Sequence, residues 1–276
     1  MREAAKKVGL FHQLPESVGR LVVGRQVAVS SFVEALAKYG TRYQYDLFSP
    51  GLQRAPIQTG LDAITTPSAS RPSVDVHDQR DLLQQSRTRD FAAWHDTQFD
   101  TYRPFALRSR MAQSFPISIV HHTLSYPDLL HDTFLRLLLN RTYPYDTIVC
   151  TSSAAKEVSA HLLEHVSSSF NEQYGTRLAY HGRLEVIPLG VDTERFKPRD
   201  KKALRSQFDL PQHAFVLLWI GRLSAIDKAD LIQLVHMFAD LVRENPDRDL
   251  KLVCAGSEHP AERFGAFLQG YAGSLN

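Results

Sequence analysis

The second half of the chain carries an apolar pattern of alternating strands and a helix. Every residue from Phe215 to Ile220 is apolar and the run ends at Gly221, which is typical of a strand buried on both faces of a parallel sheet. Apolar residues then recur at three- and four-residue spacing from 231 to 242, which predicts an amphipathic helix ending at Asn245. Leu250 to Ala255 predicts the next strand. Strand, helix and strand in this order form a βαβ unit.

The first half repeats this alternation. Short apolar runs predict strands at Val8–Phe11, Phe91–Trp94, Pro116–Val120, Tyr145–Cys150 and Leu184–Ile187, and an alternating pattern predicts a strand at Tyr43–Phe48. Periodic apolar positions predict helices at 25–40, 78–86, 102–112, 128–139 and 153–161. The predicted apolar face of the first helix consists of Val27, Ala28, Ser31, Phe32, Ala35 and Leu36. Residues 50–72 are rich in Thr, Ser, Pro and Gly, so we expect a surface loop there. The alternation predicts a doubly wound α/β domain.

Two basic residues follow the predicted strand at 215–220. Ligands of parallel α/β sheets bind beyond the carboxyl ends of the strands, so Arg222 and Lys228, six residues apart, are predicted to lie at a ligand-binding edge. We expect Lys228 in the first turn of the following helix, where free backbone N–H groups and the helix dipole also favour an anion. Two fixed cations beside a helix start suit a diphosphate. The simpler interpretation is a glycine that ends a strand, followed by two solvated cations.

These residues stand in two phrases that resemble a known family. VIPLGVDTERFKP (186–198), followed by IGRLSAIDK (220–228), is similar to the retaining group 1 (family 4) glycosyltransferases of the GT-B fold. In that family the arginine and the lysine hold the diphosphate of a nucleotide-sugar donor, which implies this role for Gly221, Arg222 and Lys228. The resemblance also implies that Gly190 and Asp192 line a cleft between two Rossmann-like domains.

The resemblance extends into the first half of the chain. The family has a glycine-rich turn beneath the donor's phosphates and sugar after its first strand, and Gly24 and Arg25 stand at that place. A glycine needed only for the turn and a surface arginine are the alternative. The segment IVHHTLSY (119–126) resembles a loop with a histidine close to the donor sugar, which implies a catalytic role for His121 or His122. Adjacent strand residues point in opposite directions, so the sequence leaves open which one faces the cleft.

The resemblance implies a GT-B-like fold with two Rossmann-like domains. We expect an N-terminal, acceptor-side domain at 1–190, a linker at 191–211 and a partial C-terminal nucleotide-sugar-binding domain at 212–276. The last segment is too short for a complete Rossmann-like domain. The family's pair of glutamates, with seven residues between them, is not found, since the nearest acids, Glu258 and Glu262, are four apart. We therefore expect a chain truncated within its C-terminal domain.

Composition narrows the classes of function. A content of 43% hydrophobic and 22% charged residues is ordinary for a soluble globular protein, and a net charge of +2 argues against nucleic-acid binding through bulk charge. Cys150 and Cys254 form no CxxC pair, so we expect reduced core thiols, and we expect no metal site and no cofactor. Without a signal peptide or a membrane-length apolar run, we expect a cytoplasmic chain. Docking to a membrane surface and the oligomeric state stay open.

The sequence thus predicts an enzyme. We expect a glycosyltransferase that moves a sugar from a nucleotide-diphosphate-sugar donor to a hydroxyl acceptor, such as a glycan, with retention and without a metal. The alternative is a truncated or degenerate glycosyltransferase-like fragment that binds a ligand or partner without turnover. A nicotinamide oxidoreductase on a similar fold is disfavoured, because no convincing G-x-G-x-x-G motif follows a strand. The sequence does not specify the base and sugar of the donor, or the acceptor.

Overall fold

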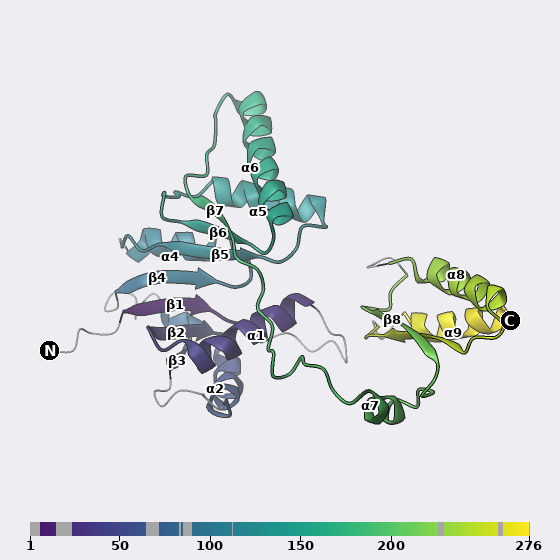
Figure 1. Cartoon of the computed structure of the whole chain (residues 1–276). Coiled ribbons are helices and arrows are strands. Elements are labelled where there is room, and N and C mark those ends of the chain that lie inside the picture. The colour runs from purple at the N-terminus through teal and green to yellow at the C-terminus, as the bar shows by residue number, and fades with distance from the viewer. Residues whose placement is uncertain are drawn as a thin grey trace. The chain divides into compact units, whose positions relative to one another are not determined.

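The chain folds into two compact units, and the division falls between Gly190 and Val191. The computed structural model describes residues 6–14, 24–64, 72–82, 84, 90–111, 113–225, 229–258 and 262–275 (Figure 1). Of the described residues, we call 6–14 and 25–190 unit 1, and Gly24 together with 191–275 unit 2. Among the described residues, none of the helices combines the length and the apolar character required to cross a membrane.

Unit 1 is built on a parallel sheet. Its described strands are β1 (Lys7–Phe11), β2 (Gln44–Ser49), β3 (Ser73–Asp78), β4 (Phe91–Asp96), β5 (Ile117–His121), β6 (Thr147–Cys150) and β7 (Arg183–Val186). They pair in the order β3-β2-β1-β4-β5-β6-β7, with every pair parallel. The chain therefore adds strands on one side of β1 as far as β3 and then crosses to the other side with β4. The point where the order reverses lies between β1 and β4.

Helices cover both faces of this sheet. They are α1 (Gly24–Tyr39), α2 (Arg54–Asp62), α4 (Arg103–Met111), α5 (Pro127–Leu138) and α6 (Ser153–Tyr174), with single 3-10 turns at η1 (Gly51–Gln53) and η2 (Gln79–Asp81). One core cluster joins Leu47 of β2 to α1 and α2. The next residue, Phe48, lies in a second cluster with residues of α4, α5 and α6. Neighbouring strand residues point to opposite faces, so the two clusters lie on the two sides of the sheet and the predicted doubly wound α/β fold is confirmed.

Two predictions about the start of unit 1 are wrong. The buried residues of α1 are Val29, Val33 and Ala37, and not the predicted face, of which Val27 is 49% and Phe32 is 37% exposed. Part of the expected surface loop at 50–72 is helix α2, whose Ile57 and Leu61 pack into the core. Residues 65–71 of that loop lie outside the described residues.

The strand β3 was missed. The helix predicted at 78–86 is wrong at its beginning, because Asp78 ends β3 and residues 79–81 form a single 3-10 turn. Residues 83 and 85–89 of the predicted helix lie outside the described residues. The residues of β3 are polar at Ser73, Asp75 and His77, so the strand shows no apolar run. It is an edge strand of the sheet, where one face and one side stay open and apolar residues are not required.

A buried ion pair fixes the centre of unit 1. Arg108 of α4 and Asp146, just before β6, are 4% and 0% exposed at their side chains, and Arg108 Nη1 lies 2.6 Å from Asp146 Oδ1. Arg108 Nη1 also donates to the Phe115 carbonyl at 3.0 Å. The Asp146 carboxylate in turn accepts hydrogen bonds from the backbone N–H groups of Ile117 and Tyr143, at 3.0 and 2.9 Å. The pair thus ties α4 to the beginnings of β5 and β6.

Unit 2 is a smaller βαβ arrangement. Its elements are α7 (Lys201–Gln207), β8 (Phe215–Ile220), α8 (Leu231–Glu244), β9 (Leu250–Ala255) and α9 (Phe264–Ser274). Strands β8 and β9 pair in parallel, so the predicted strand, helix, strand order is confirmed. The helix α7 lies within the segment 191–211 that was expected to be a linker. The buried core consists of Leu231, Val235, Phe264 and Leu268.

The predicted burial of β8 on both faces is wrong. Phe215, Leu218 and Ile220 are 64%, 58% and 75% exposed. The helices α8 and α9 pack together over the buried cluster, but no second helical layer covers the other face within the described part of unit 2. An uninterrupted apolar run therefore identified the strand, but it did not establish the surroundings of the strand.

Candidate functional site

The candidate site of unit 1 lies at the carboxyl ends of β1, β4 and β5. Ligands of open parallel α/β sheets bind at such an edge, where the strand order reverses, and here that point lies between β1 and β4. Four polar groups gather around it: His12 follows β1, Thr97 follows β4, His122 follows β5, and Arg25 lies in the first turn of α1. The start of α1 adds the partial positive charge of a helix N-terminus.

His122 is the more accessible of the two adjacent histidines. Its Nε2 atom lies 3.0 Å from the Thr97 carbonyl oxygen. A carbonyl only accepts hydrogen bonds, so Nε2 carries the proton, and the neutral ring keeps a lone pair on Nδ1. Burial lowers the pKa of His122, the hydrogen bond to Thr97 opposes that shift, and the positive charge of Arg25 lowers the pKa further. Arg25 and His122 are therefore electrostatic neighbours.

His121 is a core residue. It ends β5, is 3% exposed and packs with its ring centroid 4.0 Å from Phe99 and 5.8 Å from Phe134. Its Nδ1 atom accepts a hydrogen bond from the Thr123 N–H group at 3.2 Å. Burial lowers the pKa of His121 to about 4, so the ring is neutral at neutral pH. The two histidines thus occupy different surroundings, one inside the aromatic core and one at the sheet edge.

Two further groups at this edge were not singled out as site residues from the sequence. His95 of β4 lies with Nδ1 2.8 Å from Ser118 Oγ, and burial lowers its pKa to about 4. The Oδ1 atom of Asp96 accepts hydrogen bonds from the backbone N–H groups of Gln98 and Asp100, at 2.9 and 2.7 Å. Burial nevertheless raises the pKa of Asp96 to about 6. The sequence did contain a signal that could have identified His95 and Asp96, because both are polar residues at the end of an apolar strand.

Several buried polar atoms of this edge have no hydrogen-bond partner among the described residues. They are His12 Nδ1, His95 Nε2, Asp96 Oδ2, Thr97 Oγ1 and His121 Nε2. Buried polar atoms in native proteins are nearly always satisfied by protein, ordered water or a ligand. Their concentration at the carboxyl ends of neighbouring strands is therefore consistent with a site that takes a polar ligand.

The glycines and the aspartate predicted to line the donor loop are placed as follows. Gly24 begins α1, and a side chain there would meet no atom within 4 Å, so nothing within the described chain requires a glycine at this position. At Gly190, too, an added Cβ atom would have no neighbouring atom within 4 Å. Asp192 accepts hydrogen bonds from the backbone N–H groups of Glu194 and Arg195 at 3.0 and 3.1 Å, so it stabilises an exposed turn.

In unit 2, two glycines bring the ends of β8 and β9 together. A side chain on Gly256 would place its Cβ 1.6 Å from the carbonyl oxygen of Gly221, so the two strand ends pack backbone against backbone. The ladder continues there, because the Gly221 N–H group donates to Ala255 O at 3.0 Å and the Leu223 N–H group donates to Ser257 O at 2.9 Å. Arg222, between them, is half-buried.

The predicted second cation of this edge is not placed. Lys228 lies outside the described residues, together with 226 and 227. The helix α8 begins only at Leu231, so the prediction that its first turn contains Lys228 is wrong. Asp230 caps that helix, and its Oδ1 atom accepts hydrogen bonds from the N–H groups of Ile232 and Gln233 at 3.1 and 3.2 Å. A carboxylate therefore already occupies the helix start that was expected to favour a phosphate.

Glu258, one of the two acids considered from the sequence, has a structural contact. Its Oε2 atom accepts a hydrogen bond from the Gly265 N–H group at 2.7 Å, in the first turn of α9. A carboxylate near a helix N-terminus is stabilised by the helix dipole. This contact holds the segment after β9 against α9.

No protein-family model matches the chain. In sequence it is similar to D-inositol 3-phosphate glycosyltransferases. It is 40% identical over 74 residues to D-inositol 3-phosphate glycosyltransferase 2 of Catenulispora acidiphila, a match that covers 27% of this chain and 17% of that protein. It is 32% identical over 102 residues to the D-inositol 3-phosphate glycosyltransferase of Streptosporangium roseum, which covers 36% of this chain and 23% of the relative. Each match thus spans less than a quarter of the relative.

The fold is similar to solved glycosyltransferase structures. Anabaena HepE, in complex with UDP and glucose, gives a TM-score of 0.56 at 14% identity, over 98% of this chain and 66% of that chain. An E. coli structure described as trehalose-6-phosphate bound with UDP-2-fluoro glucose gives a TM-score of 0.53 at 10% identity, over 98% of this chain and 70% of that chain. At such low identity the likeness shows the fold. Together with the sequence relatives it confirms the resemblance to glycosyltransferases of the GT-B fold.

Proposed function

We propose that this chain functions as a glycosyltransferase. It would move a sugar from a nucleotide-diphosphate donor to a hydroxyl acceptor, with retention of configuration at the anomeric carbon. The observation that carries the proposal is the 40% identity over 74 residues to a D-inositol 3-phosphate glycosyltransferase. The two strand edges described above supply groups that suit this chemistry. The reaction class comes from the similarity, and the roles of the residues come from their positions.

Unit 2 holds the donor diphosphate in this proposal. The bond between the anomeric carbon and the diphosphate oxygen breaks, and its electron pair stays on the diphosphate. The acceptor's hydroxyl oxygen forms the new bond to the anomeric carbon, and its proton passes to the leaving diphosphate oxygen. Arg222, at the carboxyl end of β8, stabilises that charge together with Lys228, and preorganised cations at a leaving group are an effective source of catalysis. Gly221 and Gly256 allow the backbone around Arg222 to approach the phosphates closely. Structural neighbours bound to UDP with glucose and to UDP-2-fluoro glucose make a UDP-sugar the first donor to test.

Unit 1 positions the sugar and the acceptor. We assign the substrate contact to His122 rather than His121, because its Nδ1 lone pair is available to accept a hydrogen bond from a hydroxyl group. His121 packs in the aromatic core beneath this sheet edge and makes no substrate contact in this proposal. Arg25 and the start of α1 suit an anionic group, and the names of the relatives make D-inositol 3-phosphate the first acceptor to test. Gly24, Gly190 and Asp192 remain proposed donor-loop positions.

The test measures UDP binding by calorimetry and UDP release from UDP-glucose with D-inositol 3-phosphate present, using the full chain. Arg222→Ala is compared with Arg248→Ala, which removes an exposed arginine from the same unit. Hydrogen bonds to charged groups contribute about 1.5–3 kcal/mol, so we expect binding to weaken roughly tenfold to 150-fold in Arg222→Ala only. His122→Ala is expected to lower turnover more than it weakens UDP binding.

Three results would contradict parts of this proposal. Equal UDP affinity of the Arg222→Ala and Arg248→Ala variants would remove Arg222 from the donor site. Binding without turnover by the parent chain would favour the alternative of a non-catalytic binding module. Absence of UDP binding by the parent chain would reject a uridine diphosphate donor for this chain.

A further inference from the structure

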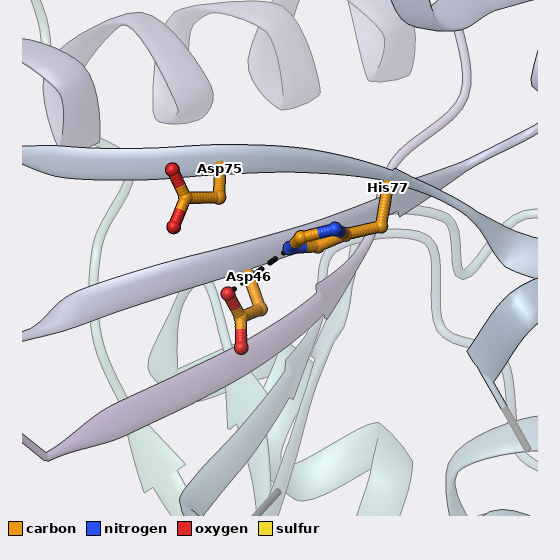
Figure 2. Close-up of side chains that lie close together, drawn as sticks. All are labelled: Asp46, Asp75 and His77. Atoms are coloured by element: carbon orange, nitrogen blue, oxygen red, sulfur yellow. Dashed lines mark hydrogen bonds and ion pairs between the residues drawn. The ribbon is translucent and has the colours of Figure 1, made fainter. Parts of the chain in front are cut away.

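A second group of polar side chains lies on β2 and β3, on the far side of β1 from β4 and β5. Asp46 of β2 pairs in register with Asp75 of β3, and Phe48 pairs with His77. Residues two apart on a strand share one face, so Asp46, Asp75 and His77 project from the same side of the sheet. Figure 2 shows the three side chains gathered there, with the His77 ring directed at the Asp46 carboxylate.

The spacing of these side chains suits a shared cation. His77 Nε2 lies 3.2 Å from Asp46 Oδ1. One ligand atom from each of Asp46, Asp75 and His77 lies within 4.8 Å of the other two. Ligands that bind one zinc ion at about 2.0–2.2 Å lie roughly 3–4 Å from one another. Small rotations of the exposed Asp75 side chain would therefore bring all three ligand atoms around one ion.

The surroundings make a cation favourable. Asp46 is 0% exposed. Its neighbour in register on β1 is Gly9, and the Trp94 ring lies so close over Gly9 that an added Cβ would be 2.3 Å from it. Phe48 stacks on Trp94 with ring centroids 5.7 Å apart. A cation bound beside the Asp46 carboxylate would lower the free-energy cost of burying that charge next to the aromatic cluster.

The outer ligand is oriented by a neighbour and open to solvent. Gln44 Nε2 donates to Asp75 Oδ2 at 2.8 Å, which leaves Oδ1 of Asp75 for another bond. Asp75 is exposed and the His77 side chain is 16% exposed, so an ion has a path from solvent to Asp46. A hydrogen bond that orients a ligating carboxylate is a regular feature of protein metal sites.

We propose that Asp46, Asp75 and His77 bind a zinc ion. Two carboxylate oxygens and one imidazole nitrogen form a mixed ligand set that suits zinc or manganese better than magnesium or calcium, which prefer oxygen alone. Water completes the coordination. The ion joins the edge strand β3 to β2 and neutralises the buried carboxylate. The ligands lie along β2 and β3 and not at the strand ends of the proposed transfer site, so this proposal is independent of a metal-free sugar transfer.

The test uses the full chain after treatment with a chelator and dialysis. Zinc is titrated in competition with a chromogenic chelator, and the melting temperature is followed in parallel. We expect one saturable equivalent of zinc and a higher melting temperature in its presence. Asp75→Asn and His77→Gln, both at solvent-accessible positions, should lose this equivalent, and Gln44→Ala should weaken binding about tenfold to 100-fold. Asp240→Asn is the matched control, since it removes an exposed carboxylate from α8.

The same variants separate a metal site from an ion pair. If His77 and Asp46 form only an ion pair, the Asp75→Asn and His77→Gln variants bind zinc as the parent chain does, or no chain binds it stoichiometrically, and either result overturns the proposal. Circular dichroism checks that each variant is folded. Manganese is the second probe and magnesium the negative control. UDP binding is measured with and without zinc, and we expect it to be unchanged, so a failure of the proposed transfer function would not be mistaken for a failure of this site.

Discussion

Unit 1 and unit 2 carry related patterns of parallel strands and helices, but they surround those strands differently. In unit 1, Phe48 of β2 is fully buried, whereas in unit 2, Ile220 of β8 is 75% exposed. The sheet of unit 1 is covered on both faces, and that of unit 2 packs on a cluster of four buried residues. Similar apolar runs therefore lead to different degrees of burial, because burial depends on how many layers the surrounding chain supplies.

This difference changes the chemistry at the strand ends. In unit 1 the strand ends bear buried histidines and Asp96, and burial shifts their pKa values. In unit 2 the strand ends consist of two glycines in close backbone contact and the half-buried Arg222. Unit 1 thus offers neutral hydrogen-bonding groups, and unit 2 offers a permanent charge. Under the proposed function, the first would suit a sugar and the second a diphosphate.

The chain's two tryptophans allow the units to be compared directly. Trp94 lies in unit 1 and Trp219 in unit 2. Replacing one of them by Phe leaves a fluorescence signal from the other unit alone. The unfolding of each unit in urea is then followed separately, and each substitution below is made in the background that reports on its own unit.

The largest expected effect comes from breaking the buried ion pair of unit 1. Arg108→Met leaves the Asp146 carboxylate buried without its partner, and we expect unit 1 to lose about 3–5 kcal/mol of unfolding free energy. The matched change in unit 2 is Arg205→Met, because Arg205 donates to the carbonyls of Pro211, Gln212 and Ala214 at 2.6, 3.1 and 2.9 Å but is only half-buried. We expect a smaller loss there, and an equal loss in both units would show that burial does not distinguish them.

The second effect is a pH dependence confined to unit 1. Burial lowers the pKa of His12, His95 and His121 to about 4, below the 6.5 of the unfolded chain. The unfolded chain therefore binds more protons between pH 6.5 and about 4, and unit 1 loses stability as the pH falls through this window. Each histidine contributes on the order of 1.4 kcal/mol per unit of pKa shift.

Asp96 opposes this trend in part. Its pKa rises from 3.8 to about 6 on burial, so the folded state takes up its proton and gains stability as the pH falls from about 6 to 4. Three histidines outweigh one carboxyl group, so we expect a net loss. Urea unfolding at pH 7, 6, 5 and 4.5 measures this loss of unfolding free energy in unit 1, with unit 2 as the internal comparison. A flat or rising stability of unit 1 on acidification would contradict the burial of these histidines.

The smallest effect concerns the glycine contact of unit 2. Gly256→Ala would force a Cβ against the Gly221 carbonyl oxygen, and since backbone must move to relieve the clash, we expect unit 2 to lose about 1–3 kcal/mol. UDP binding should weaken as well, because the backbone next to Arg222 shifts. Gly270→Ala is the control, since that position of α9 has no atom within 4 Å of an added Cβ, and alanine there should stabilise the helix by about 0.5–1 kcal/mol. Unit 1 should unfold unchanged in both variants.

Most of the helices and strands, in their observed order, and several of their ends could be predicted from the sequence alone. The apolar runs at β1, β2, β4, β5, β6, β8 and β9 predicted strands close to those observed, because contiguous apolar residues are a local property of the chain. The helix predicted from residue 153 does begin there, and the Oγ atom of the preceding Ser152 accepts a hydrogen bond from the Ala155 N–H group at 3.1 Å. The two phrases around Gly190 and Gly221 also identified the glycosyltransferase resemblance without any structure.

The buried side of each element, and the polar groups that come together, depend on contacts between residues far apart in the sequence. The stripe chosen for α1 was wrong because a mixed helix offers more than one plausible face, and the sheet it packs on selects Val29, Val33 and Ala37. The polar edge strand β3 gave no apolar signal. His121 and His122 are chemically identical in sequence, and their different roles follow from Phe99 and Phe134 on one side and Thr97 on the other. Likewise, Asp46 and His77 come together only through the pairing of β2 with β3, since strand register is a long-range contact that spacing along the chain does not specify.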